Sequence, residues 1–322
     1  MTYSSHGLAA DQGITLQRSH EFEAFRKTVS SAFVPLQVSS GQHGAFLSSI
    51  RSASALDFHL TELSAGSHQV ERTSELIRQG GPDYYKVSLI LAGSSLLIQD
   101  SREVFLRPGD LAVYDTSRPY SLISEEQSRI IVAMFPKSSF ELPESQIHQV
   151  SAINLAAPGQ LGSLAAALLA KVSGSLDQLA GPFGVRIAHS CLDVLATAFA
   201  GSLGTDRPVT DPRERLLLDI HAYIDRNLAS PELTPGSIAA AHFISTRHLH
   251  GLFHAEGVTV SSWIRQKRLA RCKRELSDPI LVNRSVAAIA AAWGFPDPAH
   301  FSRTFKSSFG ESPRDFRARF IS

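Results

Sequence analysis

Cysteine is scarce in this sequence, and features that would carry a chain into or across a membrane are missing. The two cysteines among 322 residues, Cys191 and Cys272, lie far apart and belong to no CxxC pair. We therefore expect neither a disulfide framework nor a zinc site. The first residues lack a basic start followed by an apolar run, so no signal peptide is expected. Apolar stretches near 164–172 and 286–292 are too short to span a bilayer, and we expect a cytoplasmic protein with no membrane partner.

The length and the charge distribution both indicate more than one domain. A chain of 322 residues is long for a single domain. From Asp211 onward there are 16 Lys and Arg against 11 Asp and Glu, a net charge of +5, whereas the rest of the chain carries −4. A basic C-terminal part on an acidic body points to a polyanionic partner for that part alone.

Residues from about 45 to 135 have the pattern of short strands. Tyr84–Ala92 is rich in β-branched and aromatic residues, and Ser128–Phe135 alternates two apolar faces. Turn signals lie between such segments, at Asp100-Ser101, Pro108-Gly109-Asp110 and Arg118-Pro119. Strands at this spacing favour a small barrel or sandwich.

Two Ala/Leu-rich segments, Leu161–Val172 and Phe183–Leu203, follow with helical spacing. They predict an apolar helical hairpin at about 160–203, which needs a partner: either the barrel or a second copy of the chain. We place a first domain at 1–205, a linker at 206–212 within the Gly-, Pro- and Thr-rich stretch Gly201–Pro212, and an all-helical domain at 213–322.

The C-terminal part repeats itself at an offset of 51 to 53 residues. Ile238–Ala241 returns as Ile289–Ala292, and further matches are Leu249 with Phe301, Phe253 with Phe305, Gly257 with Gly310, Thr259 with Ser312, and Trp263 with Phe316. In each copy a short helix precedes a turn and a second helix, capped by Ser245 or by Asp297 with Pro298 behind it. Helix, short turn and helix form a helix-turn-helix unit, although apolar spacing of this kind also suits a plain helical bundle.

The outward face of each second helix favours DNA over the bundle, because it carries hydrogen-bond donors and no acid. Arg pairs with guanine edges, hydroxyls reach bases or phosphates, and Lys neutralises phosphate. The first helix presents Thr246, Arg247, His250 and His254, and the second presents Ser302, Arg303 and Lys306. Between the units, Val260–Leu276 predicts one long basic helix that spaces two recognition helices by roughly one DNA turn, about 34 Å, with its charges available to phosphates.

These motifs resemble the AraC/XylS family of bacterial transcription regulators. The match runs through IAAAHFISTRHLHGLFHAEGVTVSSWIRQKRLARCKREL and SVAAIAAAWGFPDPAHFSRTFKSSFGESPRDFRARF. The resemblance implies base-reading positions at Arg247, His250 and Gly251 in the first unit, and at Pro298, Ala299, His300, Ser302 and Arg303 in the second. Gly251 has no side chain to bond a base in the first unit, and Pro298-Ala299 offers little hydrogen bonding at the tip of the second helix. We expect the first unit to dominate direct base reading, with the second contributing phosphate grip and shape recognition.

The N-terminal half resembles the ligand-binding domain of the same family, in its XylS- and FeaR-like subgroup, through GSHQVERT, YYKVSLILAG and FLRPGDLAVYDTSRPYSL. That resemblance implies a cupin-like barrel for a small organic effector of aromatic or acidic character, followed by dimerising helices. The whole chain is then an α+β multidomain protein, an effector-responsive activator that binds promoter DNA as a homodimer and engages RNA polymerase. His68, Arg72, Tyr85 and Lys86 are the candidate effector-binding residues.

Two alternatives remain at this point. One is a DNA-binding regulator that responds to no ligand, with a barrel that only dimerises. The other is a cupin-type metal enzyme, which needs clustered His and carboxylate ligands. The barrel segment offers His59 and His68 but no HxH followed by a suitably spaced Glu, and Asp110 suits the turn after Pro108-Gly109. No nucleophile elbow, phosphate loop or catalytic dyad is recognisable, so no catalytic or metal-binding residue and no cofactor are predicted.

Overall fold

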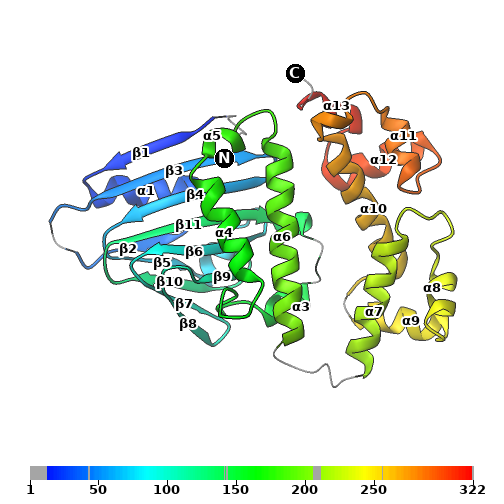
Figure 1. Ribbon diagram of the computed structural model, residues 1–322, viewed down its shortest axis with the longest axis horizontal. Helices are drawn as coiled ribbons and strands as arrows, with labels where there is room; N and C mark the ends of the chain where they lie inside the picture. The colour runs from blue at the N-terminus through cyan, green and yellow to red at the C-terminus, as the bar shows by residue number, and fades with distance from the viewer. Residues whose placement is uncertain are drawn as a thin grey trace. The chain divides into compact units, whose positions relative to one another are not determined.

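The computed structural model describes residues 13–42, 44–140, 142, 144–205, 212–255 and 257–320. The chain divides into two compact units, Met1–Asp206 and Arg207–Ser322 (Figure 1). Residues 206–211, most of the linker expected at 206–212, lie outside the described residues. Within the described part of the chain, no helix combines the length and apolarity needed to cross a membrane.

Two antiparallel sheets form the N-terminal unit. The six-stranded sheet has the order β1 (Thr15–Ser19), β3 (Ser48–Ala55), β4 (Phe58–Ala65), β11 (Ser128–Pro136), β6 (Tyr84–Ala92) and β9 (Leu111–Asp115). The five-stranded sheet has the order β2 (Gln37–Ser39), β5 (His68–Arg72), β10 (Tyr120–Ser124), β7 (Ser95–Gln99) and β8 (Arg102–Leu106). The strands expected from the alternating segments are therefore present, and β1 and β2 precede the range expected for the barrel.

The hairpin turns follow from local backbone chemistry. Asp100 and Ser101 have φ of 56° and 61° between β7 and β8, the left-handed conformation that a tight two-residue hairpin requires. Asp110 accepts a hydrogen bond from the Arg107 amide at 2.8 Å and so closes the turn before β9. Both turns agree with the sequence prediction.

One hydrophobic core lies between the sheets. Ile130, Val132 and Met134 of β11 contribute to it, together with Phe25 and side chains of both sheets. Helix α1 (Phe22–Ala32) supplies Phe25 and Val29. This inner core makes the unit the expected small barrel or sandwich.

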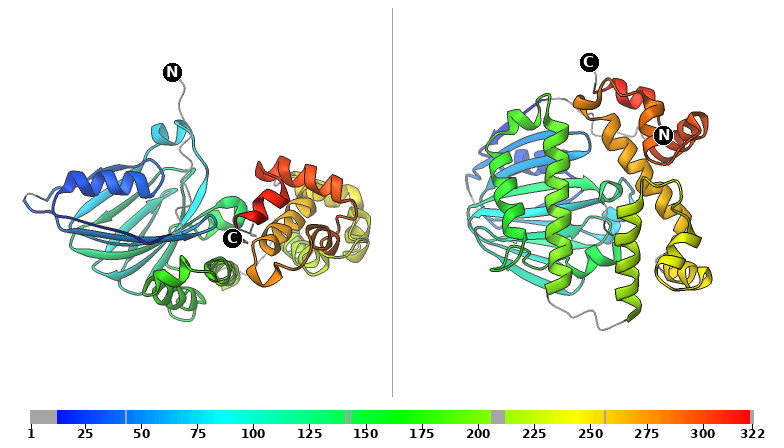
Figure 2. Two further views of the ribbon diagram at one scale, coloured as in Figure 1. Left: turned by 90° about the horizontal axis from the view of Figure 1, so that it is seen from above. Right: turned by 45° about the vertical axis from the view of Figure 1, so that its right-hand side comes forward.

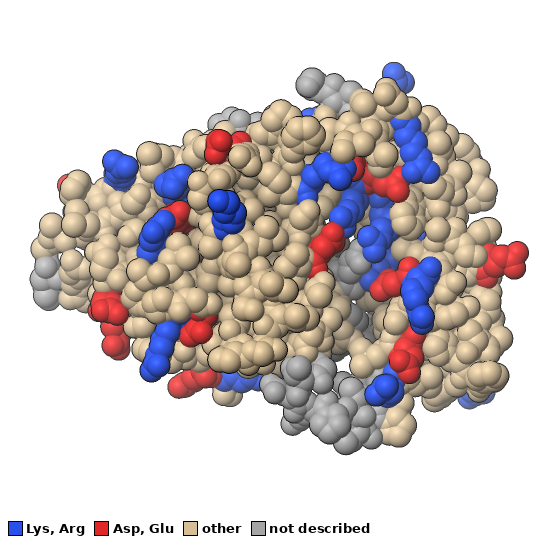
Figure 3. All heavy atoms as spheres, viewed as in Figure 1, with Lys and Arg blue, Asp and Glu red and all other residues tan. Residues whose placement is uncertain are grey.

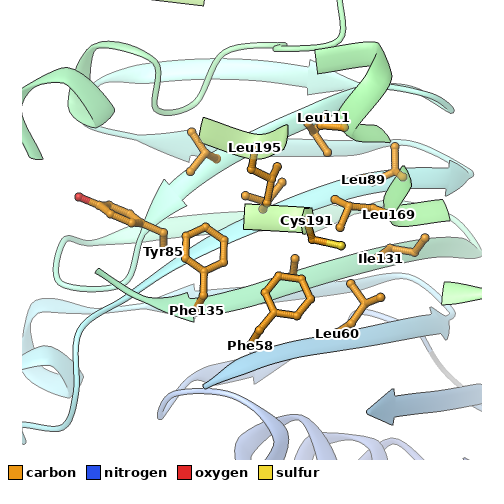
Figure 4. Close-up of a cluster of buried hydrophobic side chains, with 14 of the residues drawn as sticks. Phe58, Leu60, Tyr85, Leu89, Leu111, Ile131, Phe135, Leu169, Cys191 and Leu195 are labelled. Atoms are coloured by element: carbon orange, nitrogen blue, oxygen red, sulfur yellow. The ribbon is translucent and has the colours of Figure 1, made fainter. Parts of the chain in front are cut away.

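A second core covers the outer face of the six-stranded sheet. The alternate β11 residues Ile131, Ala133 and Phe135 pack there with buried side chains of α4 (Gly162–Ser173), α5 (Leu176–Leu179) and α6 (Gly184–Thr205). Figure 2 shows these green helices against one side of the strands, and Figure 4 shows Leu169 of α4 and Cys191 and Leu195 of α6 beside the sheet residues. The predicted helical hairpin therefore has the barrel as its partner.

The C-terminal unit is helical in its described residues. Its order is α7 (Pro212–Asn227), α8 (Pro235–Ala241), α9 (Thr246–Ala255), α10 (Val260–Leu276), the 3-10 turn η2 (Pro279–Leu281), α11 (Val286–Ala292), α12 (Pro298–Phe309) and α13 (Pro313–Ala318). Shorter elements of the N-terminal unit are α2 (Ser74–Arg78), η1 (Lys137–Ser139) and α3 (Glu144–Gln149).

Capping side chains start the short helices where the sequence predicts. The Ser245 hydroxyl accepts from the His248 amide at 3.1 Å ahead of α9, and the Asp297 carboxylate accepts from the Ala299 and His300 amides ahead of α12. Each bond satisfies an amide that has no partner within its helix. These caps fix where both second helices begin.

Candidate DNA-binding surface and barrel cavity

The two helix pairs α8–α9 and α11–α12 have the same inward-facing residues. Ile238 and Ala239 of α8 are buried, as are Ile289 and Ala290 of α11. The α9 pair packs on α7 and the first half of α10, whereas Phe301 and Phe305 of α12 form a ring cluster with Phe316 of α13. The helix pairs lie toward opposite ends of α10 (Figure 1). The repeat found in the sequence is thus two structural units.

The outward face of α9 carries the side chains that the sequence singled out. Thr246, Arg247, His250, Gly251 and His254 are all exposed, while Leu249, Leu252 and Phe253 are buried. A Cβ built at Gly251 meets no heavy atom within 4 Å. The face is therefore open around a bare stretch of backbone, flanked by one guanidinium and two imidazoles.

The outward face of α12 is less equipped to read bases. Pro298, Ala299 and His300 are exposed at its first turn, and Arg303 and Lys306 are exposed further along. The Ser302 hydroxyl donates to the Pro298 carbonyl at 2.9 Å. That hydroxyl proton is therefore used inside the helix and is not offered to DNA. The charged donors of this face are Arg303 and Lys306.

The sequence predicted that the charges of α10 are available to phosphates, but two of its basic residues are engaged within the protein. Lys267 is buried and pairs with Asp225 of α7 at 3.3 Å. Arg268 donates to the Leu228 and Ser230 carbonyls at 3.0 and 2.7 Å. On the face of the C-terminal unit drawn in Figure 3, blue and red side chains lie side by side. Because the helix must hold both units, several of its cations serve packing, and Arg265 is its exposed arginine.

The turns of the two helix-turn-helix units differ in backbone chemistry. Phe243 in the first has φ of 55° and is 96% exposed, and Gly294, one repeat later, has φ of 76°. A Cβ added at Gly294 would lie 2.6 Å from the Cζ atom of Arg268. Only glycine allows the second turn to approach this guanidinium.

A polar group lies inside the barrel, where the sequence nominated effector-binding residues. His68 and Lys86 line a cavity of about 30 Å³ together with Tyr114 and Tyr120, which the sequence did not single out, and with apolar side chains of α1 and both sheets. Lys86 Nζ donates to the Tyr120 hydroxyl at 3.2 Å and lies 4.2 Å from the centre of the Phe33 ring. Both tyrosines occupy inward-facing positions of β9 and β10, and the alternation along these strands could have identified them from the sequence.

The other two nominated residues are placed differently. Arg72 is buried beside the cavity and donates to the Thr116 and Pro35 carbonyls. Tyr85 lies on the opposite face of the sheet, beside Phe135 in the outer core (Figure 4), because neighbouring residues of a strand point to opposite faces. His68 and Lys86 therefore line one cavity, Arg72 is buried but is not among the residues that line it, and Tyr85 lies on the other face of the sheet.

An ionic cluster that the sequence did not reveal joins β9 to α3. Ligand atoms of Asp115, Glu144 and His148 lie within 4.8 Å of one another. Lys137 Nζ lies 2.7 Å from Asp115 and 3.2 Å from Glu144, so an ammonium already balances these carboxylates. Burial raises the pKa of Asp115, but hydrogen bonds from Lys137 and Ser117 outweigh it and hold that pKa below its usual value. His59 is a packed strand histidine bonded to the Ser54 hydroxyl at 2.7 Å.

A β-barrel unit joined to two helix-turn-helix units defines a ligand-binding type of DNA-binding regulator. A family model for AraC-binding-like domains matches residues 25–200, and one for a helix-turn-helix domain matches residues 238–319. The chain belongs to the AraC family of transcription regulators.

Relatives and solved structures agree with this assignment. The transcriptional activator NphR of Rhodococcus sp is 30% identical over 263 residues, which cover 81% of this chain and 78% of the relative. The XylDLEGF operon transcriptional activator 1 of Pseudomonas putida is 24% identical over 253 residues, or 74% of this chain and 76% of the relative. The AraC-like transcriptional activator CuxR has the same fold, with a TM-score of 0.53 at 20% identity, covering 88% of this chain and 100% of that one.

Proposed function

We propose that this protein is an effector-responsive transcription activator that reads promoter DNA mainly through α9. The observation that carries the proposal is the contrast between the two exposed recognition faces. On α9, Arg247 and His250 extend toward solvent around the open Gly251, whereas α12 begins with Pro298-Ala299. Bases are read by side chains with donors and acceptors, while phosphates need only positive charge. The α9 face therefore supplies specificity, and Arg303 and Lys306 of α12 supply backbone grip.

The remaining proposed DNA contacts are Thr246 and His254 on α9 and His300 and Ser302 on α12. A helix of 17 residues such as α10 is about 25 Å long at 1.5 Å per residue, which suits two recognition helices in successive major grooves. We place the linker between the units at 206–212, which leaves each unit with its own core.

The test compares Arg247→Ala and Arg303→Ala in binding to a selected operator and to random DNA of equal length. Arg226, exposed near the end of α7, gives a matched control in Arg226→Ala. We expect Arg247→Ala to cost about 1–3 kcal/mol on the operator alone, and Arg303→Ala to weaken both DNAs similarly while lowering the salt slope by about 1. Equal losses on both DNAs for Arg247→Ala would contradict a base-reading role.

Dimerisation is proposed through the helical layer of the N-terminal unit. Leu164 of α4 and Phe183 just before α6 are large apolar side chains that are 62% and 59% exposed. An apolar layer of this kind favours a second copy of the chain. Leu164→Glu should shift the molar mass measured by light scattering from dimer to monomer, whereas the control Lys27→Glu, exposed on α1, should leave it unchanged. An unchanged mass for Leu164→Glu would contradict this interface.

The proposed mode of action is activation in the bacterial cytoplasm through contact with RNA polymerase, with no catalytic step, metal or cofactor. Its support is the pairing of a DNA-binding unit with a barrel whose buried polar residues face inward. Promoter transcription by purified polymerase in the presence of this protein tests it, because a sensor of another kind would leave transcript levels unchanged.

A further inference from the structure

Two basic side chains are buried in the barrel without a matching anion. Lys86 is 3% exposed and Arg72 is 5% exposed. Among the described residues, neither has a carboxylate within ion-pair distance: Lys86 bonds only the Tyr120 hydroxyl, and Arg72 bonds two backbone carbonyls. Buried cations are ordinarily paired, because removing a charge from water is costly. Neither Lys86 nor Arg72 therefore has a carboxylate partner among the described residues.

The same cavity contains a buried acceptor with no donor. His68 Nδ1 lies 2.8 Å from the Gly66 carbonyl and therefore carries the proton. Its Nε2 is buried and has no hydrogen-bond partner. Burial lowers the pKa of His68, so the ring is neutral and Nε2 presents a lone pair. An unsatisfied buried acceptor and a buried amine with no carboxylate partner around one cavity are features of a site completed by a ligand.

We propose that this cavity binds a small organic acid as its anion, with the negative oxygens held by Lys86 and a donor group received by His68 Nε2. The inference rests on the effector role proposed above for the barrel. The apolar lining, which includes Phe33 and Tyr114, gives the carbon skeleton of the acid a nonpolar surface.

Binding requires one wall to move. The cavity of about 30 Å³ is about the space that one water molecule occupies in the liquid. The Phe33 ring covers the Lys86 ammonium, and Phe33 and Leu36 belong to the connection between α1 and β2 rather than to a sheet. Leu36 also lines an open groove of about 550 Å³ outside the barrel. This connection is the wall through which the acid enters, since moving it breaks no strand pairing.

Protonation gives the site a characteristic pH dependence. Burial, together with the positive charge of the nearby Arg72, lowers the pKa of Lys86 to about 7. Around it, burial raises the pKa values of Tyr114 and Tyr120, which stay neutral, and Arg72 stays charged. Lys86 is thus the group that must take up a proton when the anion binds above pH 7. Affinity for the anion should fall about tenfold per pH unit above that value.

The experiment uses the full chain and a matched panel: benzoate, phenylacetate and acetate, the neutral benzamide and phenylacetamide, and the cationic benzylamine. Calorimetry and thermal unfolding should show that a carboxylate binds at least about tenfold more tightly than its amide. Lys86→Met should remove this preference, whereas Lys171→Met, exposed on α4, should keep it. If Lys86→Met does not fold, the pH series on the unaltered chain decides.

Three results would overturn the inference: amides that bind as well as acids, a preference for benzylamine, or no binding by any carboxylate at millimolar concentration. Binding of the unaltered chain to its operator is measured in parallel, without any of these small molecules. If the unaltered chain does not bind the operator, the proposed function is contradicted. If it binds the operator but shows no preference for anions, only this inference is contradicted.

Discussion

Gly294→Ala offers a sharp test of how the second helix-turn-helix unit is attached to the first. Gly294 has φ of 76°, and an added Cβ would lie 2.6 Å from Arg268 Cζ. A left-handed conformation costs a residue with a side chain about 1–2 kcal/mol. The guanidinium sits at the end of a flexible side chain, but two carbonyls of the α7–α8 connection hold it. Displacing it costs about another 1–3 kcal/mol.

These contributions outweigh the opposing effect on the unfolded chain. Replacing glycine by alanine restricts the unfolded state and stabilises a protein by about 0.4–1 kcal/mol. We therefore expect Gly294→Ala to lower the unfolding free energy by about 1–4.6 kcal/mol. That is a large fraction of the stability of a typical domain, which is about 5–15 kcal/mol.

Tryptophan fluorescence during urea unfolding isolates this effect. The chain has two tryptophans, Trp263 and Trp293, and both lie in the C-terminal unit, the second next to Gly294. Gly251→Ala is the matched control, because Gly251 is helical and its Cβ would meet nothing within 4 Å. A loss of less than about 1 kcal/mol for Gly294→Ala, below the lower bound for a left-handed residue, would refute the reasoning.

Three further outcomes are expected. Gly251→Ala should raise the unfolding free energy, measured by urea titration of the tryptophan signal, by about 0.5–1 kcal/mol; a loss of stability would mean that the helix needs glycine there before DNA binds. Phe243→Gly should leave stability unchanged or raise it by up to about 1 kcal/mol, because relief of the left-handed conformation exceeds the added freedom of the unfolded glycine and an almost fully exposed ring loses no packing; a clear loss would show that the ring contacts something. In the N-terminal unit, burial holds the folded pKa of Lys86 near 7 while the unfolded chain keeps its proton to about pH 10, so unfolding takes up a proton and stability rises with pH across that window. Circular dichroism melts should show this rise weakened in Lys86→Met, and equal slopes would contradict a buried, neutralised amine.

Strong periodicity made most of the fold predictable from the sequence. Ser128–Phe135 alternates two apolar sets, and each set packs into its own core. The repeat at 51 to 53 residues likewise located both helix-turn-helix units. The weaker signals were missed: β2 has only three residues, and every residue of β1 except the last is exposed. Phe25, Val29 and Phe33 do have helical spacing, so α1 was open to prediction.

The functional residues were harder to predict because composition does not reveal pairing. Lys267 and Arg268 look like free charges in the sequence, yet both contact the α7 region. Tyr85 and Lys86 were nominated together although adjacent strand residues cannot face one cavity. The Asp115 cluster joins residues of β9, η1 and α3, whose proximity depends on tertiary packing.

The six-stranded sheet has consequences for how effector preference changes between related proteins. Ile130 and Val132 line the cavity, while the alternate residues Ile131 and Ala133 pack against the α4–α6 layer. A change of size on this strand is therefore constrained from both sides. The five-stranded sheet has alternate residues partly open to solvent on its outer face, as in β5 and β10. New effector preferences should consequently arise through that sheet and the α1–β2 connection, leaving the helix-bearing wall nearly invariant while the opposite wall diversifies.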